Sequence, residues 1–403
     1  MKFSIVNLGC KVNRVESDDV AAMLLARGAT CSDLPDADVV IVNTCTVTGE
    51  AEKKTRKAVR HALRANTCAK VVVTGCAVAI DPETYDVMSD RVVTVPKGDL
   101  MSAVEREFES ARELRLGEGF PTRVGIKVQD GCNNACTYCI VHVARGRAWS
   151  RPLEQIVDEA VAYDRAGVRE MVLTGINLGS YSVEIANGAR GGLAYLLKSL
   201  LSSVENARFR ISSIEPKDID DDLIDILSSS GGRVCRHLHL PLQSGSSKVL
   251  KEMARPYDAA YYLGLVTRLR RAVPSLALST DIIVGFPGET EEDFQATLDM
   301  VRACRFSKVH AFRYSMREGT PAASRPDQIP PEVKAARLKE LERVAEEARC
   351  DDLMLRYGEE EQALVETEGV ATTESYYSVE APSGSVPGEL VSVSLCGARA
   401  LYD

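Results

Sequence analysis

The chain has 403 residues, more than one compact core accommodates, so two or three domains are expected. Its net charge of -9 argues against a broad, non-specific nucleic-acid binder and leaves room for a local basic groove. No apolar run approaches the ~18 residues of a membrane span. We therefore expect a cytoplasmic protein without a membrane partner, in which the 12 cysteines favour metal ligation over disulfides.

The first predicted domain, residues 1–115, has three strand-like runs that each end beside a cysteine. Residues 3–9, 39–44 and 71–75 are followed by Cys10, Cys45 and Cys76. Helical patterns over 16–26 and 50–64 separate the runs, which predicts a parallel α/β sheet. Because the carboxyl ends of parallel strands share one edge, the three cysteines are expected to converge there as a metal site.

Other interpretations of this domain stay open. Cysteine is a common small residue in cores, and Cys31 and Cys68, which lie outside the pattern, are interpreted as structural. The second helical pattern is strongly basic, which suits either a solvated face or contact with RNA phosphates. Its basic residues are Lys53, Lys54, Arg56, Lys57, Arg60, His61 and Arg64.

A compact cysteine motif follows. Cys132, Cys136 and Cys139 are separated by three and then two residues. Three thiolates leave one iron of a tetranuclear cluster without a protein ligand, so that a small molecule can bind there and accept an electron. A structural zinc site with His142 as the fourth ligand is the alternative.

The central region, residues 120–330, alternates six strand patterns with helical ones. The strands are expected at 123–128, 170–174, 208–212, 237–240, 279–284 and 308–312. Six such units predict a partial parallel (β/α)6 barrel, with functional residues in the loops after the strands. Those loops are rich in glycine and polar residues, as a pocket for a small charged cofactor requires.

The C-terminal part is expected to be a linking helix at 331–357 and a small antiparallel β module at 358–403. The strand patterns of the module lie at 363–366, 376–379 and 390–395, with turn residues between them.

Over nearly its whole length the chain resembles the radical S-adenosylmethionine (SAM) methylthiotransferases. The resemblance implies that Cys10, Cys45 and Cys76 hold an auxiliary [4Fe-4S] cluster and that Cys132, Cys136 and Cys139 hold the SAM-binding [4Fe-4S] cluster. The module at the end resembles a TRAM domain, by which the family recognises RNA. Within the family, residues 11–13, 129–134 and 237–243 look most like the threonylcarbamoyladenosine tRNA methylthiotransferases.

That branch methylthiolates the modified adenosine directly 3′ of the anticodon. The implied mechanism cleaves SAM at one cluster, so that the resulting radical removes hydrogen from C2 of the adenine, and takes a methylated sulfur from the other. In such enzymes the cofactors carry the radical chemistry and the protein supplies positioning. From their loop positions, Asn177, Glu215 and Gln243 are the candidates for SAM contacts.

The implied partners are a tRNA substrate and an electron donor such as a flavodoxin or ferredoxin; the sulfur donor and the tRNA species stay open. Two departures from the family pattern stand out. His142 replaces a common proline, and the short acidic tail has Arg399 as its one basic residue. Alternative substrates are isopentenyladenosine in tRNA and a ribosomal-protein aspartate. The alternative of another class is a non-catalytic iron–sulfur protein that binds RNA or transfers electrons.

Overall fold

The structure is a computed structural model that describes residues 2–26, 28–46, 49–100, 122–185 and 188–395. The chain divides into two compact units, which are described separately. The first comprises the chain up to Phe120 with Gly131–Asn133 and Cys139–Arg147, and the second comprises the remainder. The predicted boundary between the first two domains, at 115–120, lies outside the described residues.

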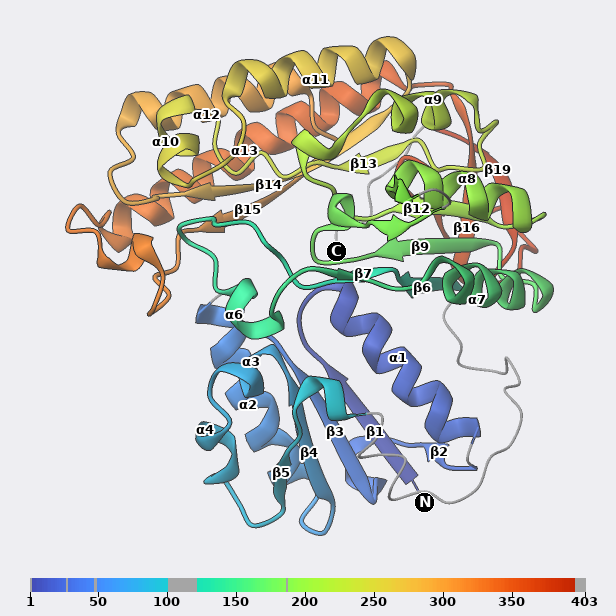
Figure 1. Ribbon diagram of the computed structural model, residues 1–403, viewed down its shortest axis with the longest axis vertical. Coiled ribbons are helices and arrows are strands. Elements are labelled where there is room, and N and C mark those ends of the chain that lie inside the picture. Colours follow the sequence, from blue (N-terminus) through green and yellow to red (C-terminus); the bar gives the residue numbers. More distant parts are fainter. Residues whose placement is uncertain (1, 27, 47–48, 101–121, 186–187, 396–403) are drawn as a thin grey trace. The chain divides into compact units, whose positions relative to one another are not determined.

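The N-terminal unit is a parallel sheet flanked by helices (Figure 1). Its five strands run in the order β2-β1-β3-β4-β5, where three were predicted. The two strands that were not predicted, β2 and β5, are the outer strands of the sheet. They have only two and three residues, too few to show a periodic pattern. The elements are β1 (Lys2–Asn7), α1 (Lys11–Ala26), β2 (Thr30–Cys31), β3 (Val39–Thr44), α2 (Gly49–Ala65), β4 (Lys70–Gly75), α3 (Cys76–Ile80), α4 (Glu83–Asp86), β5 (Val92–Thr94) and α6 (Val141–Arg145).

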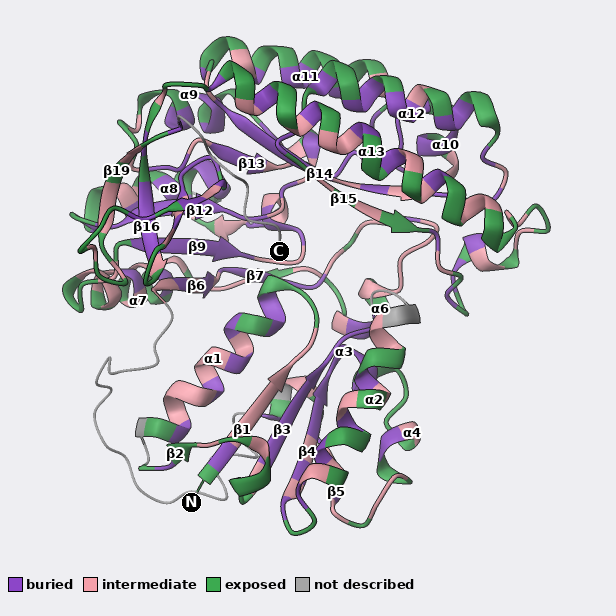
Figure 2. Cartoon of the chain, turned by 180° about the vertical axis from the view of Figure 1, so that it is seen from behind, coloured by how far each residue is buried: buried purple, intermediate pink, exposed green. Residues whose placement is uncertain are grey.

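Both faces of this sheet are buried, as continuous valine and isoleucine runs predict. On one face Val42 and Val73 belong to a core cluster that includes Val59 of α2. On the other face Ile41 belongs to a cluster that includes Leu24 of α1. Figure 2 shows the central strands buried between exposed helix faces. The strands thus form a rigid support for whatever follows their carboxyl ends.

The second unit contains the predicted six-stranded parallel barrel. Two three-stranded sheets, β12-β9-β6 and β13-β14-β15, are joined by isolated parallel bridges such as Ser213 with His239. Its strands are β6 (Arg123–Lys127), β9 (Glu170–Thr174), β12 (Arg208–Ile211), β13 (His237–His239), β14 (Ala277–Val284) and β15 (Lys308–Arg313). Its helices are α7 (Leu153–Arg165), α8 (Leu193–Ser203), α9 (Asp221–Ser229), α10 (Ser247–Glu252), α11 (Ala259–Ala272) and α12 (Glu291–Cys304). Two small hairpin-like pairs are β7 (Gln129–Asp130) with β8 (Trp149–Ser150), and β10 (Val183–Glu184) with β11 (Arg190–Gly191).

A 25-residue helix, α13 (Pro331–Leu355), leads to the predicted antiparallel sheet. That sheet has the order β18-β17-β16-β19 and contains β16 (Glu360–Thr367), β17 (Val370–Thr373), β18 (Ser378–Glu380) and β19 (Leu390–Ser394). The expected strand at 376–379 is wrong at its start. Tyr376 has φ 74°, a left-handed turn conformation, so that the strand begins two residues later.

The antiparallel sheet is fixed to the barrel through one buried carboxylate on β9. Glu170 forms ion pairs of 2.6–2.8 Å with three arginines, Arg123, Arg208 and Arg210. Arg210 also donates to the backbone carbonyl of Glu374, at 2.8 Å. Burial alone raises the pKa of Glu170, yet the three guanidinium charges hold that pKa far below its usual range.

Among the described helices none is long and apolar enough to cross a membrane.

Candidate functional site

The strand-end cysteines of the N-terminal unit lie at one edge of its sheet. Cys10 lies three residues after the end of β1, Cys45 directly follows β3, and Cys76 is the first residue of α3 after β4. β1, β3 and β4 are adjacent and parallel, which places the cysteines on the same side of the sheet, as the pattern predicted. None of the three forms a disulfide.

The backbone before Cys10 comes very close to Cys45. A Cβ atom at Gly9 would lie 2.9 Å from the Sγ atom of Cys45, and Gly9 has φ 112°. Both facts require glycine at this position, because any side chain would be strained and would collide with the thiol. The close approach of the backbone before Cys10 to the thiol of Cys45 therefore depends on Gly9.

A network with two cationic side chains lies at this edge of the same unit, and one of the two cations lies beside a thiol. Asn13 donates from Nδ2 to the carbonyl of Thr44 at 2.8 Å, which fixes the start of α1 against β3. Its Oδ1 accepts from Lys97 at 3.1 Å and from Arg145 at 2.7 Å. Lys97 Nζ also lies 3.9 Å from Sγ of Cys76. Glu16 pairs with both cations, at 2.7 Å from Lys97 and 3.5 Å from Arg145, so that much of their charge is balanced within the unit. Three cysteine sulfurs at one edge, with the Lys97 ammonium beside one of them, fit the ligand set of an iron–sulfur cluster.

The loop with the second cysteine motif belongs to both units, so each cysteine is described within its own. In the first unit the amide of Cys132 donates to the carbonyl of Gly146 at 3.1 Å, and the amide of Val141 lies 3.4 Å from Sγ of Cys139. His142, proposed as a zinc ligand in the alternative interpretation, is exposed on α6.

Cys136, in the second unit, is buried against an arginine that sequence reasoning missed. Arg255 donates from Nη1 to Sγ of Cys136 at 3.2 Å. Its Nη2 forms an ion pair with Glu215, and its Nε donates to the hydroxyl of Tyr257 at 3.0 Å. That hydroxyl in turn donates to the carbonyl of Pro241 at 2.6 Å. Burial raises the pKa of Tyr257, so its hydroxyl remains a neutral donor.

The local backbone explains how Arg255 is directed inward. Helix α10 ends with Ala254 in a left-handed conformation, φ 55°, and the amide of Arg255 bonds back to the carbonyl of Leu250 at 2.9 Å. This is a Schellman-type helix end, in which the residue after the left-handed one turns back toward the helix. Arg255 lies 119 residues from Cys136, and no periodicity or motif connects the two.

The three predicted SAM-contact residues lie in loops that follow barrel strands, and they differ in their hydrogen-bond and ion-pair partners. Asn177 is buried; its backbone amide donates to Oε1 of Gln129 at 2.9 Å, and its Oδ1 has no hydrogen-bond partner among the residues that the structure describes. Glu215 is occupied by Arg255. Gln243 is buried and has φ 68°, and its backbone amide donates to the carbonyl of Asp281 at 2.8 Å. A buried acceptor without a donor, as in Asn177, fits a ligand that supplies one.

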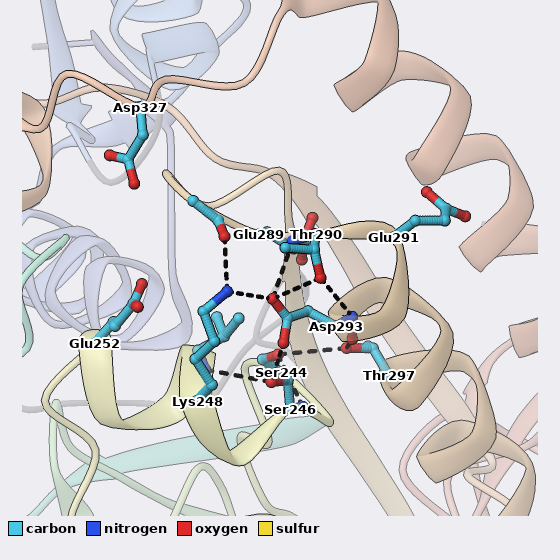
Figure 3. Close-up of polar contacts among 12 residues, drawn as sticks. Ser244, Ser246, Lys248, Glu252, Glu289, Thr290, Glu291, Asp293, Thr297 and Asp327 are labelled. Carbon is cyan, nitrogen blue, oxygen red and sulfur yellow. Dashed lines mark hydrogen bonds and ion pairs between the residues drawn. The ribbon is translucent and has the colours of Figure 1, made fainter.

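The loops after β13 and β14 are held together by Asp293 of α12 (Figure 3). Its carboxylate accepts from Ser246 and from Lys248, both at 2.7 Å. It also closes a capping box with Thr290 at the start of α12. Burial raises the pKa of Asp293, but these donors lower it to about 2, so the carboxylate stays charged. Ser246 is thus used for loop structure rather than offered to a ligand.

The basic helix α2 presents its cations on one face. Thr55, Val59 and Ala62 are buried, whereas four basic residues at helical spacing are exposed: Lys53, Lys57, Arg60 and Arg64. Arg56 differs, since it pairs with Glu52 at 2.5 Å. Lys54 is exposed as well, outside this spacing. The exposed stripe, Lys53, Lys57, Arg60 and Arg64, forms one cationic face of α2 that is able to meet phosphates.

Comparisons with known proteins agree with this architecture. Residues 126–301 match the radical SAM superfamily, and residues 2–95 match the uncharacterized protein family UPF0004. The threonylcarbamoyladenosine tRNA methylthiotransferase MtaB of Bacillus subtilis (strain 168) is 38% identical, over 83% of this chain and 78% of the relative. Its namesake from Chlamydia pneumoniae is 40% identical, over 93% of this chain and 90% of the relative. The tRNA-2-methylthio-N(6)-dimethylallyladenosine synthase of Endomicrobium trichonymphae is 37% identical, over 91% of this chain and 89% of the relative.

Among solved structures, the radical SAM methyltransferase TsrM from Kitasatospora setae superposes with a TM-score of 0.55. That match has 16% identity and covers 80% of this chain and 75% of TsrM, so it speaks for the fold alone. Fold and sequence matches together define an enzyme of the radical SAM superfamily, which implies SAM and a [4Fe-4S] cluster. The chain belongs to the radical-SAM methylthiotransferases. This membership excludes the alternative of a non-catalytic iron–sulfur protein.

Proposed function

We propose that the protein is a tRNA methylthiotransferase that converts N6-threonylcarbamoyladenosine to its 2-methylthio derivative at the position 3′ of the anticodon. The observation that carries this proposal is the set of three relatives, 36–40% identical, that bear the name threonylcarbamoyladenosine tRNA methylthiotransferase. They match over 83–96% of the chain, so that both cysteine regions and the barrel lie within the likeness.

Dimethylallyladenosine in tRNA is the second candidate substrate. Relatives named for that substrate are 34–37% identical, a range that overlaps the 36–40% of the first group. The two adenosine derivatives differ chemically, because a threonylcarbamoyl group carries a carboxylate and a hydroxyl whereas a dimethylallyl group is apolar. The names of both groups of relatives support a tRNA nucleoside over a ribosomal-protein aspartate.

Two cysteine triads are assigned to two [4Fe-4S] clusters in this proposal. Cys132, Cys136 and Cys139 hold the cluster whose open iron takes SAM, and the strand-end triad holds the auxiliary cluster. When bound, these groups supply the radical that activates the adenine C2 position and the sulfur that is inserted there. The strand-end triad is Cys10, Cys45 and Cys76.

Polar and charged side chains around the two triads hold the cysteine sulfurs in place and balance charge near them. Arg255 directs a hydrogen bond at Cys136 and is itself held by Glu215, so the cysteine sulfur sits in a fixed electrostatic environment. In the N-terminal unit Lys97 and Arg145 share contacts with Asn13 and with the carboxylate of Glu16, and this network holds the Lys97 ammonium 3.9 Å from Sγ of Cys76. Asn177 offers its buried Oδ1 as an acceptor for a donor group of SAM.

The proposed partners are tRNA and an electron donor such as a flavodoxin or ferredoxin. The exposed stripe of α2 is assigned to tRNA phosphates, because β16–β19 carry mostly acidic charge. The experiment that tests substrate choice uses protein reconstituted anaerobically with iron, sulfide, SAM and a reductant. It is offered tRNA bearing threonylcarbamoyladenosine and, separately, tRNA bearing dimethylallyladenosine. Mass spectrometry of the nucleosides should show methylthiolation of the first; reaction of the second alone would reject the assignment.

A further inference from the structure

Two histidines and an aspartate come together on the barrel sheet, outside both cysteine triads. They are His239 of β13, Asp281 of β14 and His310 of β15. One nitrogen of each histidine and one oxygen of the aspartate all lie within 4.8 Å of one another. The imidazole rings of His239 and His310 have centroids 5.6 Å apart and are tilted by 55°.

The strand register explains this convergence. β13, β14 and β15 are adjacent and parallel; His239 pairs with Ser279, and Asp281 pairs with His310. Side chains two residues apart on a strand share a face, so Asp281 lies on the same face as Ser279 and hence as His239. The flanking residues Leu278 and Ile282, which alternate with Ser279 and Asp281 along β14, belong to the core cluster that the helices pack against. Three strands therefore hold the three side chains rigidly on the sheet face that the helices do not cover.

The orientation of His239 suits a ligand role. Its Nδ1 lies 2.9 Å from Oγ of Ser279, which directs Nε2 toward Asp281, 3.3 Å from Oδ2. A metal-binding histidine typically has one ring nitrogen held by such a partner while the other faces the ion. Two ligands of a tetrahedral zinc ion, each ~2.0–2.1 Å from the metal, are themselves about 3.3 Å apart. The separation of His239 and Asp281 already matches this spacing, and the ligand atom of His310 lies within 4.8 Å of both, so that a small side-chain adjustment completes the ligand set.

We infer that His239, Asp281 and His310 form a binding site for one divalent transition-metal ion of the zinc class. Two imidazoles and a carboxylate favour zinc or iron(II) over magnesium and calcium, which prefer all-oxygen ligands. Three protein ligands leave a coordination position open for water or an anionic group, as in catalytic rather than structural zinc sites. The side chains are accessible enough for an ion to enter, since His310 is exposed and Asp281 is half-buried. The site does not depend on the proposed substrate.

The test uses full-length protein with its iron–sulfur clusters reconstituted anaerobically, then incubated with Zn²⁺ and freed of unbound metal by gel filtration. Zinc and iron are measured by mass spectrometry, and the zinc ligands by X-ray absorption. About one zinc per chain is expected, with ligands at ~2.0 Å as for nitrogen and oxygen, not ~2.3 Å as for sulfur. His310→Gln and Asp281→Asn should each lower bound zinc at least about fivefold. Each substitution removes a metal ligand, and even the loss of a residue that only orients a ligand reduces metal affinity by such a factor or more.

His61→Gln is the matched control, since His61 is an exposed histidine on α2 and should leave bound zinc unchanged. Because His310 is also exposed, its substitution is expected to leave the iron content and the thermal unfolding of the zinc-free protein as in the wild type. Zinc at background level in the wild type, undiminished zinc in His310→Gln, or a sulfur shell at the zinc would each overturn the inference. A sulfur shell would mean that zinc had entered cysteine sites.

Discussion

Arg255 Nη1 donates a hydrogen bond to Sγ of Cys136 over 3.2 Å, although the two residues are 119 positions apart in the chain. The same guanidinium forms an ion pair with Glu215, and the paired side chains are only 3% and 13% exposed. A buried arginine thus joins a cysteine of the radical-SAM motif to a loop carboxylate that sequence reasoning had considered separately.

Replacement of Arg255 by methionine should destabilise the protein by about 3–5 kcal/mol, because Glu215 is left as an unpaired, mostly buried charge. Arg255→Lys keeps a positive charge but loses the planar arrangement of donors, so the loss should be smaller. Urea unfolding measures both. A redox titration followed by electron paramagnetic resonance should also show a lower cluster potential, since a hydrogen bond to a ligand sulfur is lost. Arg268→Met, at an exposed ion pair, is the control; equal stability of the Arg255 and Arg268 variants would refute the prediction.

Glu170 is expected to be the main link between the barrel and the sheet β16–β19. Glu170→Gln leaves three arginines around a neutral side chain and should cost about 3–5 kcal/mol. Because Arg210 bonds to the backbone of the C-terminal sheet, amide hydrogen exchange in β17 and β18 should accelerate before that in the barrel. Uniform exchange rates in the variant would count against this anchoring role.

The same link predicts a pH dependence with a definite sign. The folded-state pKa of Glu170 lies far below the ordinary value of 4.5, so its contribution is fully present above pH 4.5. That contribution is lost as the pH falls below 4.5 toward the folded-state pKa. The difference in unfolding free energy between wild type and Glu170→Gln should therefore be constant from pH 7 to about 5 and shrink at lower pH. A difference that grows on acidification would contradict the charge assignment.

The exposed stripe of α2 makes a prediction about tRNA binding. Reversal of Lys53, Lys57 and Arg60 to glutamate should weaken binding and reduce the slope of log affinity against log salt by roughly one for each phosphate that is no longer neutralised. Reversal of Lys54, Arg56 and Lys57 should act in the same direction, although Arg56 is already paired with Glu52.

A matched control reverses three exposed cations on other helices, Lys251, Arg271 and Lys339. Fluorescence anisotropy with labelled tRNA over a range of salt concentrations measures both slopes. If the stripe and control variants bind equally well, α2 is not the phosphate-binding surface.

The two-cluster assignment predicts an iron stoichiometry. The reconstituted protein should contain about eight irons per chain, and simultaneous replacement of Cys10, Cys45 and Cys76 by alanine should lower that to about four. Both cluster sites should be lost only when Cys132, Cys136 and Cys139 are replaced as well. Unchanged iron after removal of the first triad would show that the strand-end cysteines do not bind a cluster.

Much of the barrel follows from local pattern. Strand β9 lies where residues 170–174 were expected, and the other five barrel strands agree to within two residues at each end. Hydrophobic periodicity and flanking glycines are properties of short segments, which a sequence displays directly. The cysteine edge followed from one further rule, the common polarity of parallel strands, and Cys10, Cys45 and Cys76 do lie at one edge.

What local pattern does not contain are interactions made across the fold. The bond from Arg255 to Cys136 and the arginine cluster around Glu170 connect distant segments, so no spacing predicts them. The grouping of His239, Asp281 and His310 depends on the register of three strands, which the sequence does not specify by itself. Tyr376 was assigned to a strand from the alternating pattern of residues 376–379, whereas its ring stacks on His237 and its backbone adopts a left-handed turn.

Methylthiolation of threonylcarbamoyladenosine in tRNA is the activity that we propose for this chain. The most direct measurement is mass spectrometry of tRNA nucleosides from a strain that lacks the protein, with a strain complemented by the wild-type gene and one by a Cys136→Ala variant. The 2-methylthio derivative of threonylcarbamoyladenosine should be absent from the deletion strain, its precursor should accumulate, and only the wild-type gene should restore it. Persistence of that derivative in the deletion strain would show that this protein does not make it.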